Sequence, residues 1–177
     1  FLGLKAQHHE LDSLKEVLKL SKNEIEKSRV LNQISDAYKT KDISSMIDFA
    51  NRALAISKKI KNKEEEANAY LNLGNSQIIV GNYPKALAYF TSAKNLFEDL
   101  ELESDKNQKI QDGLARAYGS IGIVFSEQSN YSKALEYYLK ALRLYENTED
   151  KLRLSRIYNN IGVVYKSIKE EFKALEY

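Results

Sequence analysis

The strongest constraint on this chain is a phrase that recurs along it. In each copy a tyrosine is followed four residues later by a glycine, and a segment reading Lys-Ala-Leu-x-Tyr comes after both. The tyrosines and glycines of the three clear copies are Tyr70 and Gly74, Tyr118 and Gly122, and Tyr158 and Gly162. Such self-similarity is typical of repeat architectures, in which each unit buries its apolar face against the next.

Composition narrows the kind of repeat. The 177 residues include seven Gly and one Pro, too few for a loop-rich β protein, and 29% of them are charged. Leu, Ala, Lys and Glu are abundant, and these residues favour helices. We therefore expect an all-α fold in one continuous array, with no window long and apolar enough to span a membrane.

Composition also argues against the common kinds of catalysis. The chain has no Cys, which removes disulfides, thiolate metal sites and cysteine nucleophiles. His8 and His9 are its two histidines, and as neighbours they point to different faces of a helix and make a poor metal pair. A net charge of +2 argues against a phosphate-binding surface. We therefore predict no catalytic residues, no cofactor, no metal site and no nucleic-acid partner.

The recurring phrase resembles the tetratricopeptide repeat, a helix–turn–helix unit with small residues at its eighth, twentieth and twenty-seventh positions. The residues here are Ser35, Gly74, Gly122 and Gly162, then Met46, Ala86, Ala134 and Ala174, then Ala53, Ala93 and Ala141. The resemblance implies a right-handed α-solenoid of antiparallel helix pairs. It divides the chain into an N-terminal capping helix, 1–23, and units at about 24–60, 64–100, 106–147 and 149–177, the last of them truncated.

The repeats are longer than usual. The glycines lie 48 residues apart from Gly74 to Gly122 and 40 apart from Gly122 to Gly162, against about 34 in the usual unit. We expect the first excess to be a helix end near residue 98 followed by an acidic loop. The register predicts helices over about 10–20, 24–40, 43–60, 64–80, 84–98, 106–128, 131–146, 149–168 and a stub from 171.

A polar stripe is the candidate binding site. In this family the second, fifth, sixth and ninth positions of each first helix line the concave surface. An amide side chain there can pair with the backbone of an extended peptide, and an arginine can hold a carboxylate. The alternative is that these residues only keep an exposed helix face soluble. The predicted peptide-binding residues are Arg29, Asn32, Asn68, Asn72, Asn75, Arg116, Ser120, Arg156, Asn159 and Asn160.

The N-terminal residues bear on the compartment. Phe1 to Ala6 fit the tail of a cleaved export signal, which would place the chain in the periplasm or cell envelope; without such a signal the chain would be cytoplasmic.

The N-terminal helix is expected to pack through Leu11, Leu14, Val17 and Leu18. The arrangement resembles the repeat region of bacterial sensor histidine kinases and LuxR-type regulators, especially of the Bacteroidetes.

The C-terminal unit is expected to leave an open apolar face. We predict that this face consists of Tyr158, Ile161, Tyr165 and Ile168, and that the stub with Phe172, Leu175 and Tyr177 is too short to cover it. A second copy could cover it by forming a homodimer.

The leading hypothesis is a protein- or peptide-binding scaffold in the sensing or docking region of a larger bacterial signalling protein. It requires no direct insertion into a membrane. The alternative is an assembly or self-association module without a peptide ligand. Any catalytic activity would lie in a domain outside this chain.

Overall fold

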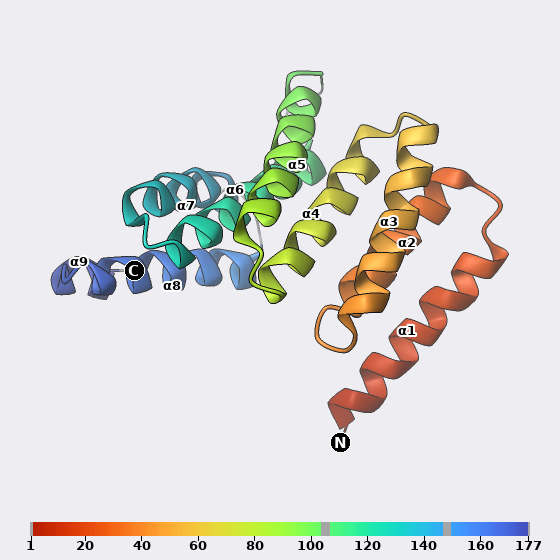
Figure 1. The fold of residues 1–177 in the computed structure, drawn as a ribbon, viewed down its shortest axis with the longest axis horizontal. Coiled ribbons are helices and arrows are strands. Elements are labelled where there is room, and N and C mark those ends of the chain that lie inside the picture. Colours follow the sequence, from red (N-terminus) through yellow and green to blue (C-terminus); the bar gives the residue numbers. More distant parts are fainter. Residues whose placement is uncertain (1, 104–106, 147–149, 177) are drawn as a thin grey trace. The chain divides into compact units, whose positions relative to one another are not determined.

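The computed structural model describes residues 2–103, 107–146 and 150–176, and the side chains of residues 10–103, 107–146, 150–170 and 173–175. Within these residues the regular elements are all α-helices (Figure 1). They are α1 (Leu2–Leu20), α2 (Glu24–Ala37), α3 (Ile43–Lys59), α4 (Lys63–Ile79), α5 (Tyr83–Glu103), α6 (Gln108–Glu127), α7 (Tyr131–Tyr145), α8 (Lys151–Ser167) and α9 (Glu171–Glu176).

The helices group into two compact units, residues 1–89 and residues 90–177, and α5 contributes to both. In unit 1, α1 to α4 lie side by side, and consecutive helices run in opposite directions (Figure 1). In unit 2, α7 packs against α6 and α8, and α9 packs against α8. Antiparallel helix pairs are therefore the building block of each unit.

The same tight turn closes three of the helix pairs. Gly81, Ser129 and Lys169 all have a left-handed backbone, with φ of 75°, 58° and 63°. In each turn the next residue donates its N–H to a carbonyl five residues back, at 2.8 to 2.9 Å. Such a bond satisfies a carbonyl at the helix end that has no helical partner.

Polar residues begin most of the helices. The Asn62 side chain accepts a hydrogen bond from the Glu65 N–H at 2.9 Å at the start of α4. Equivalent caps are made by Asn23, Asp42, Asn107, Asn130 and Asp150. These side chains occupy N–H groups that the first turn of a helix leaves unpaired.

Apolar residues of α1, α2 and α3 form part of the core of unit 1. Leu11 of α1 is buried with Val30 and Ile34 of α2, and Leu14 and Leu18 pack beside them. Val17 was predicted to pack here as well, but it is 40% exposed. It is one residue from Leu18 on a helix and so points toward a different side.

Unit 2 is built around a cluster from α6, α7 and α8. Tyr138 and Ala134 of α7 and Ile161 of α8 are among its buried members. Tyr118, Tyr158 and Tyr165 pack against this cluster from its edge. The tyrosines that mark the repeat are therefore packing residues in this unit.

Gly122 makes room for an aromatic ring. A Cβ atom at this position would lie 2.6 Å from two ring atoms of Tyr138, closer than carbon atoms can pack. The Tyr138 ring, which lies four residues beyond Ala134 on α7, fills the space left by the missing side chain.

Two glycines of α6 provide a test of this packing. We expect Gly122→Ala to lower the free energy of unfolding by about 1–3 kcal/mol, because the buried Tyr138 ring has no room to move away. The control is Gly119→Ala, whose Cβ would meet the end of the Ile157 side chain at 3.1 Å and the Ala141 Cβ at 4.0 Å. Alanine's better helix propensity, about 1 kcal/mol, should make the control neutral or stabilising. Urea unfolding measures both variants, and equal effects would contradict the packing.

The lengthened interval between the second and third repeats is largely helical. We expected a helix end near residue 98 and an acidic loop, but α5 continues to Glu103. Its additional turn has an apolar side, on which Leu100 is half-buried. Residues 104–106, the rest of the expected loop, lie outside the described residues.

Candidate functional site

A charged network joins two first helices in unit 1. Glu65, the third residue of α4, is 2% exposed. Its carboxylate accepts hydrogen bonds from Arg29 Nε at 3.1 Å and from Asn32 Nδ2 at 3.0 Å. Asn32 also donates to the Glu65 backbone carbonyl at 3.0 Å. Two charge-assisted bonds thus hold α4 against α2.

Asn72 extends this network along the same pair of helices. Its Nδ2 donates to the backbone carbonyl of Asn32 at 2.9 Å. The Oδ1 atoms of Asn32 and Asn72 are buried and accept no hydrogen bond within the described part of the chain. The structure brings together Arg29, Asn32 and Asn72, which the sequence had predicted as one site.

Their burial changes the role of the two amides. Asn32 is 6% exposed and Asn72 is 2% exposed, so neither presents its side chain on an open groove. The prediction that both line an accessible surface is wrong in this respect, because their amide N–H groups bind the neighbouring helix. Arg29 remains half exposed beside them.

Unit 2 has a corresponding contact between its first helices. Arg153 of α8 pairs with Asp112 of α6, and also with Asp150 at 3.3 Å. Close by along the helices, Gly119 of α6 approaches Ile157 of α8. The first helices of each unit are thus joined by an ion pair and by packing.

Three of these charged residues, Glu65, Asp112 and Arg153, were not predicted from the sequence. A positional signal was present for two of them. Glu65 stands five residues before Tyr70, and Arg153 stands five residues before Tyr158. Charged side chains at the same place in the register mark the contact between first helices, although their signs differ between the two units.

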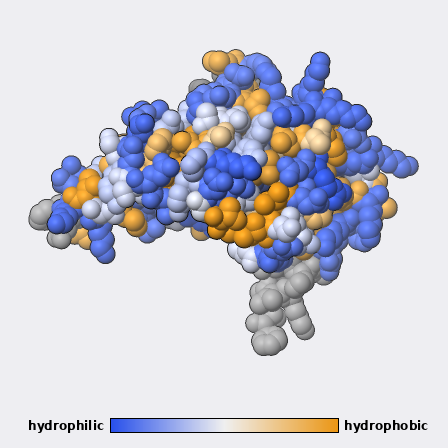
Figure 2. Space-filling view, in the orientation of Figure 1, coloured by the Kyte–Doolittle hydropathy of each residue, from blue (hydrophilic) through white to orange (hydrophobic). Residues whose placement is uncertain are grey.

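The remaining predicted site residues lie on α4, α6 and α8 with partial or full exposure. Arg156 and Asn159 are exposed on α8. The half-buried members are Asn68, Asn75, Arg116, Ser120 and Asn160. Asn75, Ser120, Arg156, Asn159 and Asn160 make no hydrogen bond through their side chains within the described part of the chain. On the face shown in Figure 2, hydrophilic residues predominate and apolar residues gather in separate patches.

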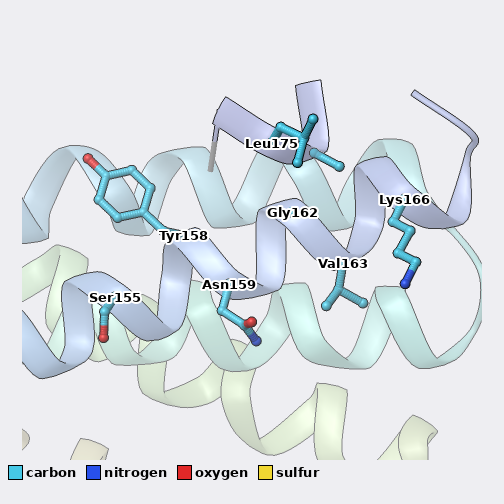
Figure 3. Close-up of a pocket in the computed structure, with 8 residues that line it drawn as sticks. Ser155, Tyr158, Asn159, Gly162, Val163, Lys166 and Leu175 are labelled. Carbon is cyan, nitrogen blue, oxygen red and sulfur yellow. The ribbon is translucent and has the colours of Figure 1, made fainter. Parts of the chain in front are cut away.

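A pocket of about 660 Å³ lies on α8 beside α9 (Figure 3). Ser155, Asn159 and Val163 point to one side of α8, as expected for residues spaced four apart. Tyr158, Gly162, Lys166, Ala174 and Leu175 complete its lining. One predicted site residue, Asn159, therefore lies in this pocket.

The open face of α8 differs from the predicted one. We expected Ile161 on it, but Ile161 is completely buried in the unit 2 core. Tyr158 and Tyr165 pack against that core, and Ile168 is 40% exposed at the end of the helix. The exposed apolar side chains of α8 are instead Leu152 and Val163, and Leu175 is exposed on α9. The side chain of Phe172 and the whole of Tyr177 lie outside the described residues.

Lys94, Glu98 and Tyr118 form a polar cluster in unit 2 whose role is structural. The Tyr118 hydroxyl donates to Glu98 at 2.8 Å, and burial together with this carboxylate raises the pKa of Tyr118. Burial alone would raise the pKa of Glu98, but hydrogen bonds from Lys94 and Tyr118 outweigh it and hold that pKa below its ordinary value. Burial raises the pKa of Tyr138 to about 12. These tyrosines stay neutral at physiological pH and are poor proton-transfer groups.

The described residues hold neither a cluster of metal ligands nor a membrane-spanning helix. No three His, Asp or Glu side chains among them come together as metal ligands. Among the described helices, none combines the length and the apolar character that crossing a membrane requires.

Two family models match the chain, and both describe tetratricopeptide repeats. A family model described as the SusR N-terminal TPR domain matches residues 4–101, more than half of the chain. A tetratricopeptide repeat model matches residues 112–177. A comparison with curated proteins gives no match.

Solved structures share the fold at low sequence identity. A Rap protein complexed with Competence and Sporulation Factor has a TM-score of 0.82 and 21% identity over 99% of this chain. Aspartyl phosphate phosphatase F from Bacillus subtilis has a TM-score of 0.78 and 20% identity over 97% of this chain. NprR in complex with its cognate peptide NprX has a TM-score of 0.72 and 21% identity over 96% of this chain. The chain spans 48%, 46% and 49% of these three proteins, about half of their length.

These neighbours are helical solenoids, and the present chain has the same all-α architecture of antiparallel helix pairs. The recurring tyrosine–glycine phrase coincides with the first helices of these pairs. The repeat, the helix pairs and the two family matches together show that the chain belongs to the tetratricopeptide-repeat family, with a SusR-type N-terminal repeat domain at residues 4–101.

Proposed function

We propose that this chain is a protein- or peptide-binding module in a bacterial signalling protein. The observation that carries the proposal is a set of uncommitted polar groups on the first helices. Asn75 of α4, Ser120 of α6 and Asn160 of α8 are half-buried and make no side-chain hydrogen bond within the described residues. An amide in such a place can both donate to and accept from the backbone of an extended peptide.

Arginines in the same stripe support the same proposal. Arg29 on α2 and Arg116 on α6 occupy the second position of the tetratricopeptide repeat and are partly exposed. A guanidinium group can hold a carboxylate of a bound segment through two hydrogen bonds. Asn68 of α4 is half-buried in the same stripe. We treat the stripe of each unit as a separate contact surface for an extended segment.

The signalling context rests on similarity. Two of the solved proteins with this fold are bound to a peptide or factor, the Rap protein with Competence and Sporulation Factor and NprR with NprX. The N-terminal repeats match the family model described as the SusR N-terminal TPR domain. We propose that the present chain serves a comparable docking or sensing role, with catalysis, if any, performed by other domains.

A peptide selected against the whole chain tests the binding function. Peptides are selected from a displayed random library, and their affinity is measured by calorimetry. We expect Asn75→Ala or Asn160→Ala, depending on which unit binds, to weaken affinity by about 1–3 kcal/mol, because a backbone group of the peptide loses its partner.

The control for this experiment is Asn95→Ala, which removes an exposed amide from α5. Its affinity should equal that of the unsubstituted chain. Unchanged affinity in both Asn75→Ala and Asn160→Ala would contradict binding by the stripe and would direct attention to the second helices or the turns.

Self-association is the second candidate function. It is favoured by the exposed apolar side chains at α8 and α9, of which Leu175 is 86% exposed. Light scattering over a range of concentrations tests it, because a dimer closed by this face should dissociate on dilution and be weakened by Leu175→Ser. A chain that stays monomeric at all concentrations would contradict it.

A further inference from the structure

One short phrase of α2 returns in α8. Residues 28–34 read Ser-Arg-Val-Leu-Asn-Gln-Ile, and residues 155–161 read Ser-Arg-Ile-Tyr-Asn-Asn-Ile. Arg29 and Asn32 therefore correspond to Arg156 and Asn159. Both pairs have the spacing of three that places side chains on one face of a helix.

In unit 1 this pair binds a carboxylate. Arg29 and Asn32 hold the two oxygens of Glu65 at 3.1 and 3.0 Å, and Asn32 also binds the Glu65 carbonyl. Because Glu65 is the third residue of α4, the pair recognises the first turn of the helix that packs on α2. The contact fixes both the position of α4 and its direction.

In unit 2 the corresponding groups have no such partner. Arg156 and Asn159 are exposed and make no side-chain hydrogen bond among the described residues. Asn159 lines the pocket on α8 beside Val163, which is 51% exposed (Figure 3). Lys166 also lines this pocket, and none of the described side chains that line it is a carboxylate. The surface therefore combines an apolar strip with uncompensated positive charge.

We propose that Arg156 and Asn159 form a carboxylate-binding site for a helix that packs on α8 as α4 packs on α2. The occupant is the first helix of a further tetratricopeptide unit, with glutamate or aspartate at its third position. The carboxylate binds the Arg156 guanidinium and the Asn159 amide, and the apolar side of the helix covers Val163. The inference concerns the end of the array and does not rest on the proposed peptide groove.

A second copy of this chain fits the site poorly. Among the described helices, the carboxylates at a third position are Glu26 of α2 and Glu65 of α4. Glu65 is buried against Arg29, and Glu26 accepts a hydrogen bond from Ser21 Oγ at 2.6 Å. Both are already engaged within their own chain, which favours a helix from outside the described repeats.

An extended chain tests the proposal with a known helix. A second copy of residues 50–103 is added after Tyr177. This junction keeps the repeat register, because Tyr177 stands three residues after Ala174, as Phe49 stands three residues after Met46. The added α4 sequence then brings its Glu65 to α8. We expect amide hydrogen exchange in α8 to slow by about tenfold or more relative to the 177-residue chain, because a packed helix opens less often.

Charge-specific variants separate the carboxylate contact from packing. Glu65→Gln in the added copy, or Arg156→Ala, should speed amide hydrogen exchange in α8 by about three- to tenfold relative to the extended chain. The double variant should speed it no more than either single substitution does. The control is Lys151→Ala, which removes an exposed positive charge from the start of α8 and should change nothing. Equal protection with Glu and Gln would overturn the carboxylate site, and no added protection would overturn the docking surface.

A second measurement does not depend on folding of the extension. A synthetic peptide of residues 61–80 at millimolar concentration should shift the amide resonances of Arg156 and Asn159 in the 177-residue chain, and its Glu65→Gln form should shift them less. Equal shifts with both peptides would overturn the proposal. Concentration-dependent protection of α8 in the chain alone, removed by Asn159→Ala, would show instead that a second copy is the occupant.

Discussion

Phe97→Ala is expected to lower the free energy of unfolding by about 3–5 kcal/mol. Phe97 lies on α5 in unit 2 and is 1% exposed. Removing its ring takes away the transfer free energy of a large apolar side chain and leaves a cavity that the surrounding helices fill only partly. Urea unfolding followed by circular dichroism measures the loss. The control is Leu102→Ala on the same helix, where the side chain is 89% exposed and the effect should stay within about 0.5 kcal/mol.

The partner of Phe97 adds a second, more specific expectation. A Cβ atom on Gly113 would lie 2.3 Å from the Phe97 ring, so Gly113→Ala should destabilise the unsubstituted chain. With Phe97→Ala in place the same substitution enters a cavity, and its helix propensity should make it stabilising by about 1 kcal/mol. Independent, additive effects of the two substitutions would contradict the contact between α5 and α6.

The sequence predicted the helix pairs well because several signals agreed. The tyrosine–glycine phrase marks first helices, and Asn or Asp stands before most helices as a cap. The end of α5 was predicted too early because its acidic residues suggested a loop. Glu98 instead binds Lys94 and Tyr118 within the helical region, so charge density alone did not indicate a helix end.

The candidate site was predicted less completely. Asn32 and Asn72 were assigned to a groove from their positions in the repeat, yet both are buried between helices. Asn32 is held there by Glu65, whose partners lie 33 and 36 residues away in sequence, and Asn72 binds the Asn32 carbonyl. A repeat register identifies which residues share a helix face, but it does not show whether that face meets solvent or the next first helix. The corresponding Arg156 and Asn159 illustrate the difference, because the same residue types are exposed on α8.

The network around Glu65 leads to the second large expected effect. Glu65→Lys should lower the free energy of unfolding by about 3–5 kcal/mol, because it removes the partner of Asn32 and places a second positive charge beside Arg29 in a buried position. The control is Glu66→Lys, which makes the same charge change in the same turn of α4 at a half-buried residue. Both substitutions put a cation near a helix N-terminus, so their shared cost from the helix dipole cancels in the comparison.

Charge reversal at the partner completes this test. Arg29→Glu in the Glu65→Lys background restores opposite charges across the contact between α2 and α4, and should recover part of the lost stability. The recovery should be incomplete, because a lysine ammonium cannot accept the Asn32 amide hydrogen bond that the Glu65 carboxylate accepts. Urea unfolding of the two single variants and the double variant measures the coupling. If Glu65→Lys were no more destabilising than Glu66→Lys, the buried ion pair would not be what holds α4 against α2.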